Sequence, residues 1–439
     1  MLRAAVAGPV DLFTLHQRSP ERYPFLLQSA APHPQAARYD LLFAFPSDAV
    51  ELERDKSFDF FGALDDAFRH EQIEHSIDLP FAGGWFVLLG YEAARLIEPR
   101  VKLHRSPFRL PDALAVRCPA AIVYDRHERV AHAIAERDPA QIDAMRADLA
   151  VAMPTVTVRS VALTEPATED EPRRFLDGVC AILDYLRAGD VFQVNLSRAW
   201  HAKLREGITD QDIYAALRAR NPAPFAGLAR WKGATLLSSS PERLVQIDGD
   251  RVQTRPIAGT RPRAADNTED QRQLERLLAS IKERAEHIML IDLERNDLGR
   301  VCESGSVEVS ELMTTESYAH VHHIVSNVTG KLRADAGPGD VLRAVFPGGT
   351  ITGCPKVRAM EIISELEGVG RGPYTGAMGY LCRSGRLDMN ILIRSVVCED
   401  GAVTFRAGAG IVADSDPDAE LAETRAKARG LLLALGASA

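Results

Sequence analysis

The chain has 439 residues, of which 46% are hydrophobic and 26% are charged, a composition typical of folded globular proteins. Its 52 Lys and Arg residues and 61 Asp and Glu residues give a formal net charge of -9, whereas proteins that bind nucleic-acid phosphates are normally basic. No apolar run reaches the length of about 18 residues that a membrane-spanning helix needs, and the six cysteines contain no Cys-x-x-Cys pair. We therefore expect a cytoplasmic protein that binds neither nucleic acid nor membrane, without disulfides or a thiolate zinc site.

The first third of the chain has weak signals that are typical of a scaffold. Buried strands are predicted for Leu41 to Phe45 and Gly84 to Leu89, and a helix for Ala140 to Ala152 after a strand near Ala120. The segment Met153 to Pro172 contains three prolines and an acidic run, which is typical of an exposed connector. This divides the chain into an amino-terminal region, 1–152, a connector, 153–172, and a larger region, 173–439.

Helix and strand patterns alternate after the connector. Arg173 to Ala188 has helical periodicity and Val191 to Ala199 alternates like a strand. Leu236 to Ile247, followed by Arg251 to Arg255, predicts a hairpin that turns at Asp248-Gly249-Asp250. Two long helices are expected at Asn267 to Leu293 and Asp418 to Leu435. The fold predicted from these patterns is α/β or α+β, with the strands as a layered core.

Each of the two long helices carries a pair of carboxylates at i,i+3 spacing, Glu283 with Glu286 and Glu420 with Glu423. Such pairs lie on one helix face, about 5 to 6 Å apart, and are common on solvated surfaces. If the two helices faced each other, however, the four carboxylates would need a cation between them. Oxygen ligands alone would favour Mg²⁺.

Glycine and histidine motifs allow further alternatives. Gly408-Ala-Gly410-Ile-Val-Ala413 matches a loose dinucleotide fingerprint but continues into a turn, so we interpret it as a strand followed by a loop. Gly348 to Lys356 does not have the spacing of a phosphate-binding Walker loop, although a glycine-rich turn that enters a helix at Pro355 can present N–H groups to an anion. Histidines His320, His322 and His323 lack a carboxylate at the usual companion spacing, and a single histidine in a pocket is favoured over a zinc site.

Nine ordered segments resemble the chorismate-utilising enzymes, a family that includes anthranilate synthase component I, aminodeoxychorismate synthase component I and, more distantly, isochorismate and salicylate synthases. They are Gly189–Ser197, Ser239–Arg243, Pro256–Thr260, Glu286–Arg300, His320–Ser326, Pro347–Met360, Gly372–Tyr380, Ile391–Arg394 and Ala407–Lys427. The resemblance implies a large α/β sandwich, rich in antiparallel sheet and with outer helices, in which the amino- and carboxy-terminal parts interleave. It also implies Mg²⁺ dependence and chorismate as substrate.

The resemblance assigns roles to individual positions. Glu242 matches the general acid that protonates the leaving C4 hydroxyl, and His323 and Thr350 match positions beside the ring and the enolpyruvyl group. Gln193 stands where water-adding members carry a lysine base, which argues against isochorismate or salicylate synthesis. The matched substrate-binding residues are Tyr374, Arg394, Gly408, Gly410 and Lys427, and the matched Mg²⁺ ligands are Glu283, Glu286, Glu420 and Glu423.

The choice of product depends on a few positions. Many aminodeoxychorismate synthases carry a nucleophilic lysine in the Pro-Ile-x-Gly-Thr motif, whereas this chain has Ala258, as anthranilate synthases do. In contrast, Pro347 to Gly353 and the residues after Gln193 resemble aminodeoxychorismate synthases, and Gln28 departs from the Leu-Leu-Glu-Ser motif linked to tryptophan feedback. These positions favour a lysine-free aminodeoxychorismate synthase, which would form 4-amino-4-deoxychorismate for 4-aminobenzoate and folate synthesis through 2-amino-2-deoxyisochorismate. Anthranilate synthase component I, for tryptophan biosynthesis, is the alternative.

Both alternatives consume ammonia. The resemblance implies that a separate glutamine amidotransferase subunit supplies it in a heterodimer, because the chain shows no Cys-His-Glu amidotransferase module. A non-catalytic chorismate-binding module is a minor alternative, but such a module would have no reason to retain an acid, metal carboxylates and carboxylate-binding cations together.

Overall fold

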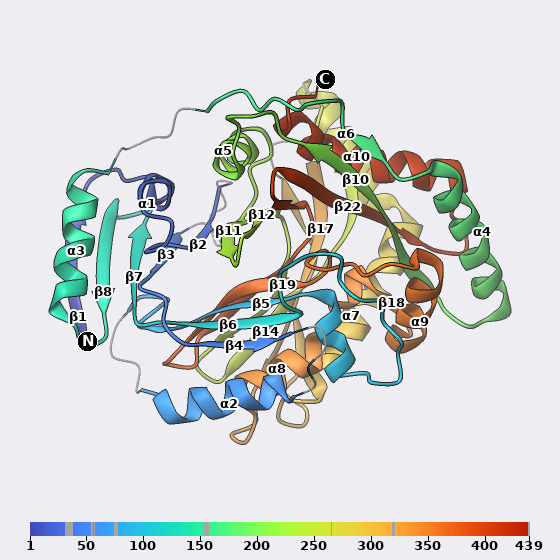
Figure 1. The fold of residues 1–439 in the computed structure, drawn as a ribbon. Helices are drawn as coiled ribbons and strands as arrows, with labels where there is room; N and C mark the ends of the chain where they lie inside the picture. The colour runs from blue at the N-terminus through green and yellow to red at the C-terminus, as the bar shows by residue number, and fades with distance from the viewer. Residues whose placement is uncertain are drawn as a thin grey trace.

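The computed structural model describes residues 1–30, 38–53, 56, 58–73, 78–152, 158–264, 266–317 and 321–437. In this part of the chain, helices and two large sheets form an α/β sandwich, as the sequence predicts (Figure 1). All of the strand pairs between named strands are antiparallel.

The larger sheet has twelve strands among the described residues, and β9 pairs with β10 at one side of the path. In spatial order the path is β1 (Leu2–Ala7), β8 (Val130–Ala135), β7 (Ala120–Asp125), β3 (Tyr39–Ala44), β2 (Phe25–Gln28), β11 (Phe225–Trp231), β12 (Ala234–Ser240), β21 (Ser395–Glu399), β22 (Ala402–Ile411), β10 (Gln193–Lys203) and β18 (Gly353–Cys354), with β9 at Thr168–Glu169. Strands from both ends of the sequence therefore share one sheet.

The second sheet has ten strands among the described residues, and β16 pairs with β17. Its path is β15 (Ile257–Pro262), β17 (Val321–Lys331), β14 (Arg251–Arg255), β13 (Arg243–Asp248), β20 (Leu387–Ile391), β19 (Ala377–Cys382), β5 (Gly84–Leu89), β6 (Ala113–Cys118) and β4 (Ala49–Leu52), with β16 at Glu308–Ser317. The predicted turn at 248–250 joins β13 to β14, but the residues before it form two strands, β12 and β13, in different sheets.

The helices are α1 (Leu12–Arg18), α2 (Phe60–Glu71), α3 (Pro139–Ala150), α4 (Pro172–Ala188), α5 (Asp210–Arg220), α6 (Asn267–Ala279), α7 (Ile281–Gly299), α8 (Pro338–Val345), α9 (Lys356–Glu367) and α10 (Pro417–Ala434), with short 3₁₀ turns at Tyr91–Leu96 and Gly349–Ile351. The predicted single helix from Asn267 to Leu293 is wrong, because the chain breaks at Ser280. The Ser280 side chain accepts a hydrogen bond from the Glu283 N–H and so caps α7.

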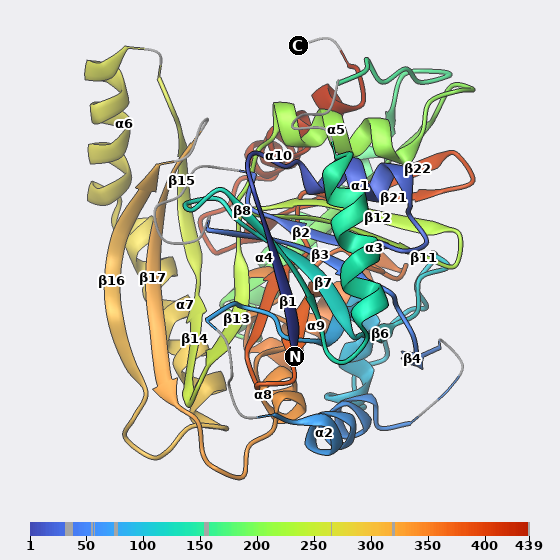
Figure 2. The same ribbon diagram turned by 90° about the vertical axis from the view of Figure 1, so that its left-hand side faces the viewer.

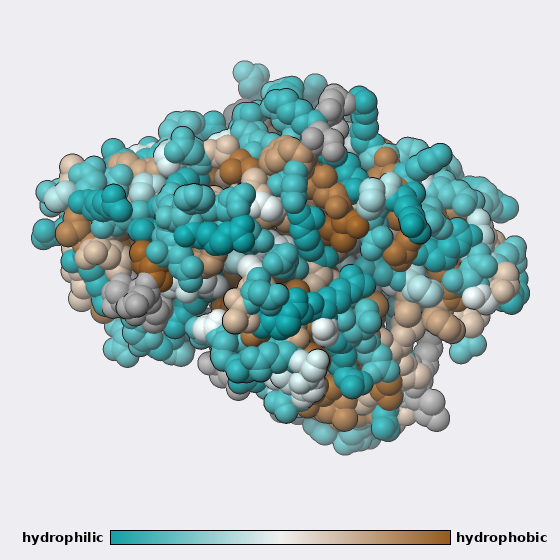
Figure 3. Space-filling model, turned by 90° about the horizontal axis from the view of Figure 1, so that it is seen from below, coloured by the Kyte–Doolittle hydropathy of each residue, from teal (hydrophilic) through white to brown (hydrophobic). Residues whose placement is uncertain are grey.

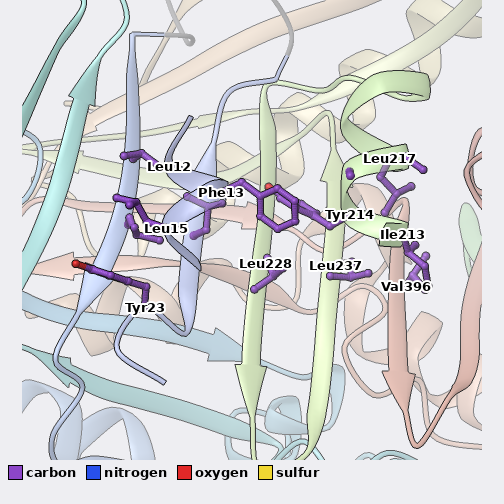
Figure 4. Close-up of a cluster of buried hydrophobic side chains, with 14 of the residues drawn as sticks. Leu12, Phe13, Leu15, Tyr23, Ile213, Tyr214, Leu217, Leu228, Leu237 and Val396 are labelled. Carbon is purple, nitrogen blue, oxygen red and sulfur yellow. The ribbon is translucent and has the colours of Figure 1, made fainter. Parts of the chain in front are cut away.

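Apolar side chains pack in three places: between the two sheets and on the outer face of each sheet. Between the sheets, Phe25 of β2 stacks on Phe86 of β5, with ring centroids 4.0 Å apart. Helices α1 and α5 cover the outer face of the larger sheet, where Phe13 meets Tyr214 edge-on at 4.9 Å (Figure 4). Helices α2 and α8 cover the second sheet on its opposite side (Figures 1 and 2). The two sheets therefore lie between outer helices.

The face seen from below in Figure 1 is largely hydrophilic, with small scattered apolar patches (Figure 3). Among the described residues, no helix is both long and apolar enough to cross a membrane.

Candidate active site

The predicted site lies where the chain passes from one sheet to the other. Glu242 is in the connection between β12 and β13, and Arg394 is in the connection between β20 and β21. The two connections are tied together, because the Ile391 N–H donates to the Glu242 carbonyl at 3.0 Å and the Ser239 N–H donates to the Arg394 carbonyl at 3.1 Å. Arg394 has a φ of +52°, a backbone conformation that is uncommon for a non-glycine residue. The fold therefore brings the predicted acid and a predicted carboxylate-binding residue into one region.

The Glu242 side chain is 5% exposed. Burial raises its pKa to about 7, while the neighbouring Thr350 hydroxyl, the Ile257 main chain and the charge of Lys427 act in the opposite direction. Its Oε1 atom has no hydrogen-bond partner among the described residues. A carboxyl with a pKa near 7 is protonated in a large fraction of molecules at neutral pH and can donate that proton to a bound molecule.

A group of cations and hydroxyls lies along β22. The Lys427 ammonium of α10 donates to the Gly408 carbonyl at 3.0 Å and forms an ion pair with Glu423 at 2.6 Å. A Cβ atom on Gly408 would lie 2.8 Å from the Tyr374 hydroxyl, so only glycine allows this approach. The Tyr374 hydroxyl and the Glu423 carboxylate both interact electrostatically with Arg394, whose pKa is nevertheless lowered by burial. The predicted substrate-binding residues therefore share one surface.

His323 and Ala258 lie on paired strands beside this surface. Ala258 of β15 pairs with Ile324 of β17, the residue after His323. Burial lowers the pKa of His323 to about 4, with the Gly259 main chain opposing the shift and Arg394 reinforcing it. The imidazole is therefore neutral at pH 7. The small Ala258 side chain carries no group that could attack a ring carbon.

The four predicted metal carboxylates are distributed over α7 and α10. The Gln193 amide donates to Glu286 at 2.5 Å, and a Cβ atom on Gly410 would lie 3.6 Å from the same Glu286 carboxylate oxygen. Glu283 lies near Gly259, Glu420 is buried, and Glu423 is paired with Lys427. Among the described residues, no three or more His, Cys, Asp or Glu side chains are placed to hold a metal ion. The magnesium site stays a prediction.

The structure adds one polar residue to the predicted site and shows a buried histidine on the helix that carries Glu283 and Glu286. Asn195 of β10 has a buried side-chain oxygen without a hydrogen-bond partner among the described residues, and a Cβ atom on Gly408 would lie 2.9 Å from it. His287 of α7 is buried and hydrogen-bonds Ser326 of β17 at 2.7 Å. Both lie inside segments that carry the family resemblance, but nothing in their local sequence distinguishes them from core residues.

The histidine cluster divides between different environments. His320 lies outside the described residues. His322 contacts Asp270 of α6 at 3.0 Å and Ser317 at 2.7 Å, so it ties α6 to the β16–β17 hairpin. His323 alone is in the candidate site.

Comparisons with known proteins identify the family of the chain. The sequence pattern of the family described as "chorismate binding enzyme" matches residues 23–433. The chain belongs to the chorismate-binding enzyme family. This chorismate-binding enzyme is 42% identical over 423 residues to the anthranilate synthase component I-like protein of Synechocystis, covering 93% of this chain and 86% of the relative. It is 43% identical over 370 residues to anthranilate synthase component 1 of Thermus thermophilus, covering 83% and 80%.

Solved structures give the same result for the fold. Anthranilate synthase component I from Streptococcus pneumoniae matches with a TM-score of 0.80 at 30% identity, covering 91% of this chain and 93% of that chain. The menaquinone-specific isochorismate synthase from Escherichia coli matches with a TM-score of 0.77 at 19% identity, covering 99% and 94%, and supports the fold alone.

These relatives correct the predicted product. The expectation of 4-amino-4-deoxychorismate and folate synthesis is wrong. The relatives that match most of this chorismate-binding enzyme are named anthranilate synthase component I or component I-like. The motif that favoured it, Pro347 to Gly353, forms a largely buried turn whose Gly348 and Gly349 lie against Ile391 and Leu293. Its glycines are explained by packing, so they carry little information about the product.

Proposed function

We propose that this protein is the synthase component of an anthranilate synthase, which converts chorismate and ammonia into anthranilate, pyruvate and water as a step of tryptophan biosynthesis. The observation that carries the proposal is the similarity, over 80% or more of both chains, to relatives named anthranilate synthase component 1. Ala258 supports it, because the chain has no lysine at that position for a covalent route.

The first step requires an acid. Chorismate carries an allylic hydroxyl at C4, and hydroxide is a poor leaving group unless it receives a proton. Glu242, with a pKa of about 7 through burial, would donate that proton as ammonia adds at C2 and the C4–O bond breaks. The products of this step are water and 2-amino-2-deoxyisochorismate, and the added nitrogen releases one proton.

The second step requires a base. Aromatisation removes the proton at C2 and breaks the bond between C3 and the enolpyruvyl oxygen, which leaves as pyruvate after taking up a proton. The Glu242 carboxylate left by the first step would take up the C2 proton, and neutral His323, whose pKa burial lowers to about 4, would accept a hydrogen bond beside the ring. Arg394 and Lys427 would hold the two carboxylates of the substrate, for which a planar guanidinium is well suited.

Mg²⁺ and a partner subunit belong to the same proposal. Glu283, Glu286, Glu420 and Glu423 would supply the oxygen ligands that this ion prefers, and the ion would withdraw charge from the ring carboxylate. A glutamine amidotransferase subunit would supply ammonia, in keeping with relatives named as one component of anthranilate synthase.

Removal of divalent cations with EDTA is expected to abolish anthranilate formation, and excess Mg²⁺ should restore it, because four carboxylates need a cation to approach one another. Glu286→Ala should raise the Mg²⁺ concentration needed for half-maximal activity and for thermal stabilisation of the protein in the presence of chorismate. Glu275→Ala, on the exposed face of α6, is the control and should leave both values unchanged. Full turnover in EDTA would contradict the proposal that the reaction needs Mg²⁺.

The identity of the product distinguishes an anthranilate synthase from the other possible functions of this chain. The purified chain should convert chorismate, Mg²⁺ and ammonium to a fluorescent aromatic amine, and the amidotransferase subunit with glutamine should replace ammonium. An amino product that retains the enolpyruvyl group would contradict the proposal. Binding of chorismate without turnover, even with that subunit, would show a non-catalytic binding module.

A further inference from the structure

A buried arginine joins four segments around the candidate site. Arg371, between α9 and β19, is 1% exposed. Its guanidinium donates five hydrogen bonds, as many as it has N–H groups. Two go to the Glu367 carboxylate at 2.6 and 3.1 Å, and the others go to the Asn195 carbonyl at 2.7 Å, the Ile351 carbonyl at 3.2 Å and the Thr375 hydroxyl at 3.2 Å. These acceptors fix both the position and the orientation of the guanidinium.

The guanidinium lies against the turn that carries Tyr374, a predicted substrate-binding residue. It is 5.6 Å from the centroid of the Tyr374 ring. The Thr375 hydroxyl, which accepts from Arg371, donates in turn to the Tyr374 carbonyl at 2.5 Å. The Tyr374 N–H donates to the Arg371 carbonyl at 3.3 Å. Arg371 therefore supports both the ring and the backbone of Tyr374.

The residue after Tyr374 has an unfavourable backbone conformation. Thr375 has a φ of +61°, which is uncommon for a β-branched residue. Besides the hydrogen bond from Arg371 to its hydroxyl, its N–H donates to the Leu392 carbonyl at 2.8 Å. Such conformations persist where the surrounding contacts hold them. Loss of the Arg371 contact should therefore let this turn relax and shift the Tyr374 ring.

The Tyr374 hydroxyl lies beside β22, since a Cβ atom on Gly408 would be 2.8 Å from it. Burial raises the pKa of Tyr374 to about 12, while the charge of Arg371 opposes the shift. The hydroxyl therefore keeps its proton near neutral pH and can donate a hydrogen bond to a substrate carboxylate. The strength of that hydrogen bond depends on where the turn places the hydroxyl.

We propose that Arg371 is a positioning residue for chorismate binding, which acts by holding the Tyr374 hydroxyl in place. The inference rests on the proposed function for the identity of the substrate. Arg371 itself is 1% exposed and leaves contact with the substrate to Tyr374. Its planar fork of five donors is essential to this role, because a lysine has the same charge but only three donors, all on one atom.

Arg371→Lys tests the proposal through the Kd for chorismate, measured by isothermal titration calorimetry with Mg²⁺ and without ammonium. The Kd should rise by about 10-fold to 100-fold, the range expected for a weakened hydrogen bond to a charged group. The control is Arg117→Lys. Arg117 is also buried, pairs with Glu71 and Glu136, and lies 5.2 Å from the centroid of the Trp85 ring, but these partners are outside the candidate site. This control should keep the wild-type Kd.

A double-mutant cycle separates positioning from a general loss of structure. Tyr374→Phe removes only the hydroxyl, so adding Arg371→Lys to it should change the Kd by less than about 3-fold. All titrations are made at a temperature where circular dichroism shows the variants folded. Equal-fold rises with and without the Tyr374 hydroxyl would mean that Arg371 has only a structural role, and would overturn the proposal.

Thr375→Val is a milder second variant, which keeps the guanidinium and removes only the hydroxyl between it and the Tyr374 carbonyl. It should also raise the Kd, by about 3-fold or more. An unchanged Kd in either folded variant would overturn the positioning role, whatever product the enzyme forms. Chorismate binding by the wild type without anthranilate formation, with the difference in Kd present, would instead refute only the proposed function.

Discussion

Replacing Glu242 by Gln is expected to lower kcat for anthranilate formation by about 100-fold to 10,000-fold, the range typical of a lost general acid. The amide has nearly the same size as the protonated carboxyl, which is the form favoured by burial near neutral pH. It cannot give a proton to the C4 hydroxyl. Steady-state kinetics with chorismate and ammonium should therefore show a loss in kcat and little change in KM.

The control for this variant is Glu365→Gln on α9, where the carboxylate is exposed and contacts Tyr185. It should retain wild-type kinetics. Turnover by Glu242→Gln at the wild-type rate would show that another group protonates the leaving hydroxyl.

Replacing Glu367 by Ala is expected to lower the free energy of unfolding by about 3 to 5 kcal/mol. Glu367 is 4% exposed and accepts hydrogen bonds from Arg371 at 2.6 Å and from Arg406 at 2.9 Å. Arg371, itself 1% exposed, also donates to the Asn195 carbonyl at 2.7 Å. Without Glu367, two buried guanidinium groups lose a shared anion beside the strand that carries Asn195. Urea unfolding followed by circular dichroism would measure the loss.

Lowering the pH should weaken the same ion pairs of Glu367 with Arg371 and Arg406. Burial alone would raise the pKa of Glu367, but the charges of Arg371 and Arg406 hold it below the usual glutamate value. The stabilisation is therefore complete above the unfolded-state pKa of about 4.3 and is lost as the pH falls through the lower folded-state pKa. Glu361→Ala, which removes a partly exposed ion pair with Arg358, should cost at most about 1 kcal/mol. An equal cost for the two variants would contradict a special contribution from the buried network.

The sequence predicts the layered sandwich and many of its elements, because long apolar runs such as Gly84 to Leu89 have few alternatives to a buried strand. It does not predict the break at Ser280, since a serine within a helical pattern is both a tolerated residue and a helix cap. It also fails to separate β12 from β13, because both strands have similar patterns and only the pairing of distant segments assigns them to different sheets.

The arrangement of the site residues also depends on the pairing of distant segments. Glu242 and Arg394 are recognisable from their motifs, but their common position at the crossings between sheets depends on strand pairings between residues about 140 to 165 positions apart. The predicted product is wrong because the glycines of Pro347 to Gly353 serve packing and do not mark specificity.

The stoichiometry of pyruvate tests the central proposal most directly. The purified chain, supplied with chorismate, Mg²⁺ and ammonium, should release one molecule of pyruvate and form one molecule of anthranilate for each chorismate consumed, with both products rising together. Consumption of chorismate with an amino product and no pyruvate would contradict the assignment as an anthranilate synthase component.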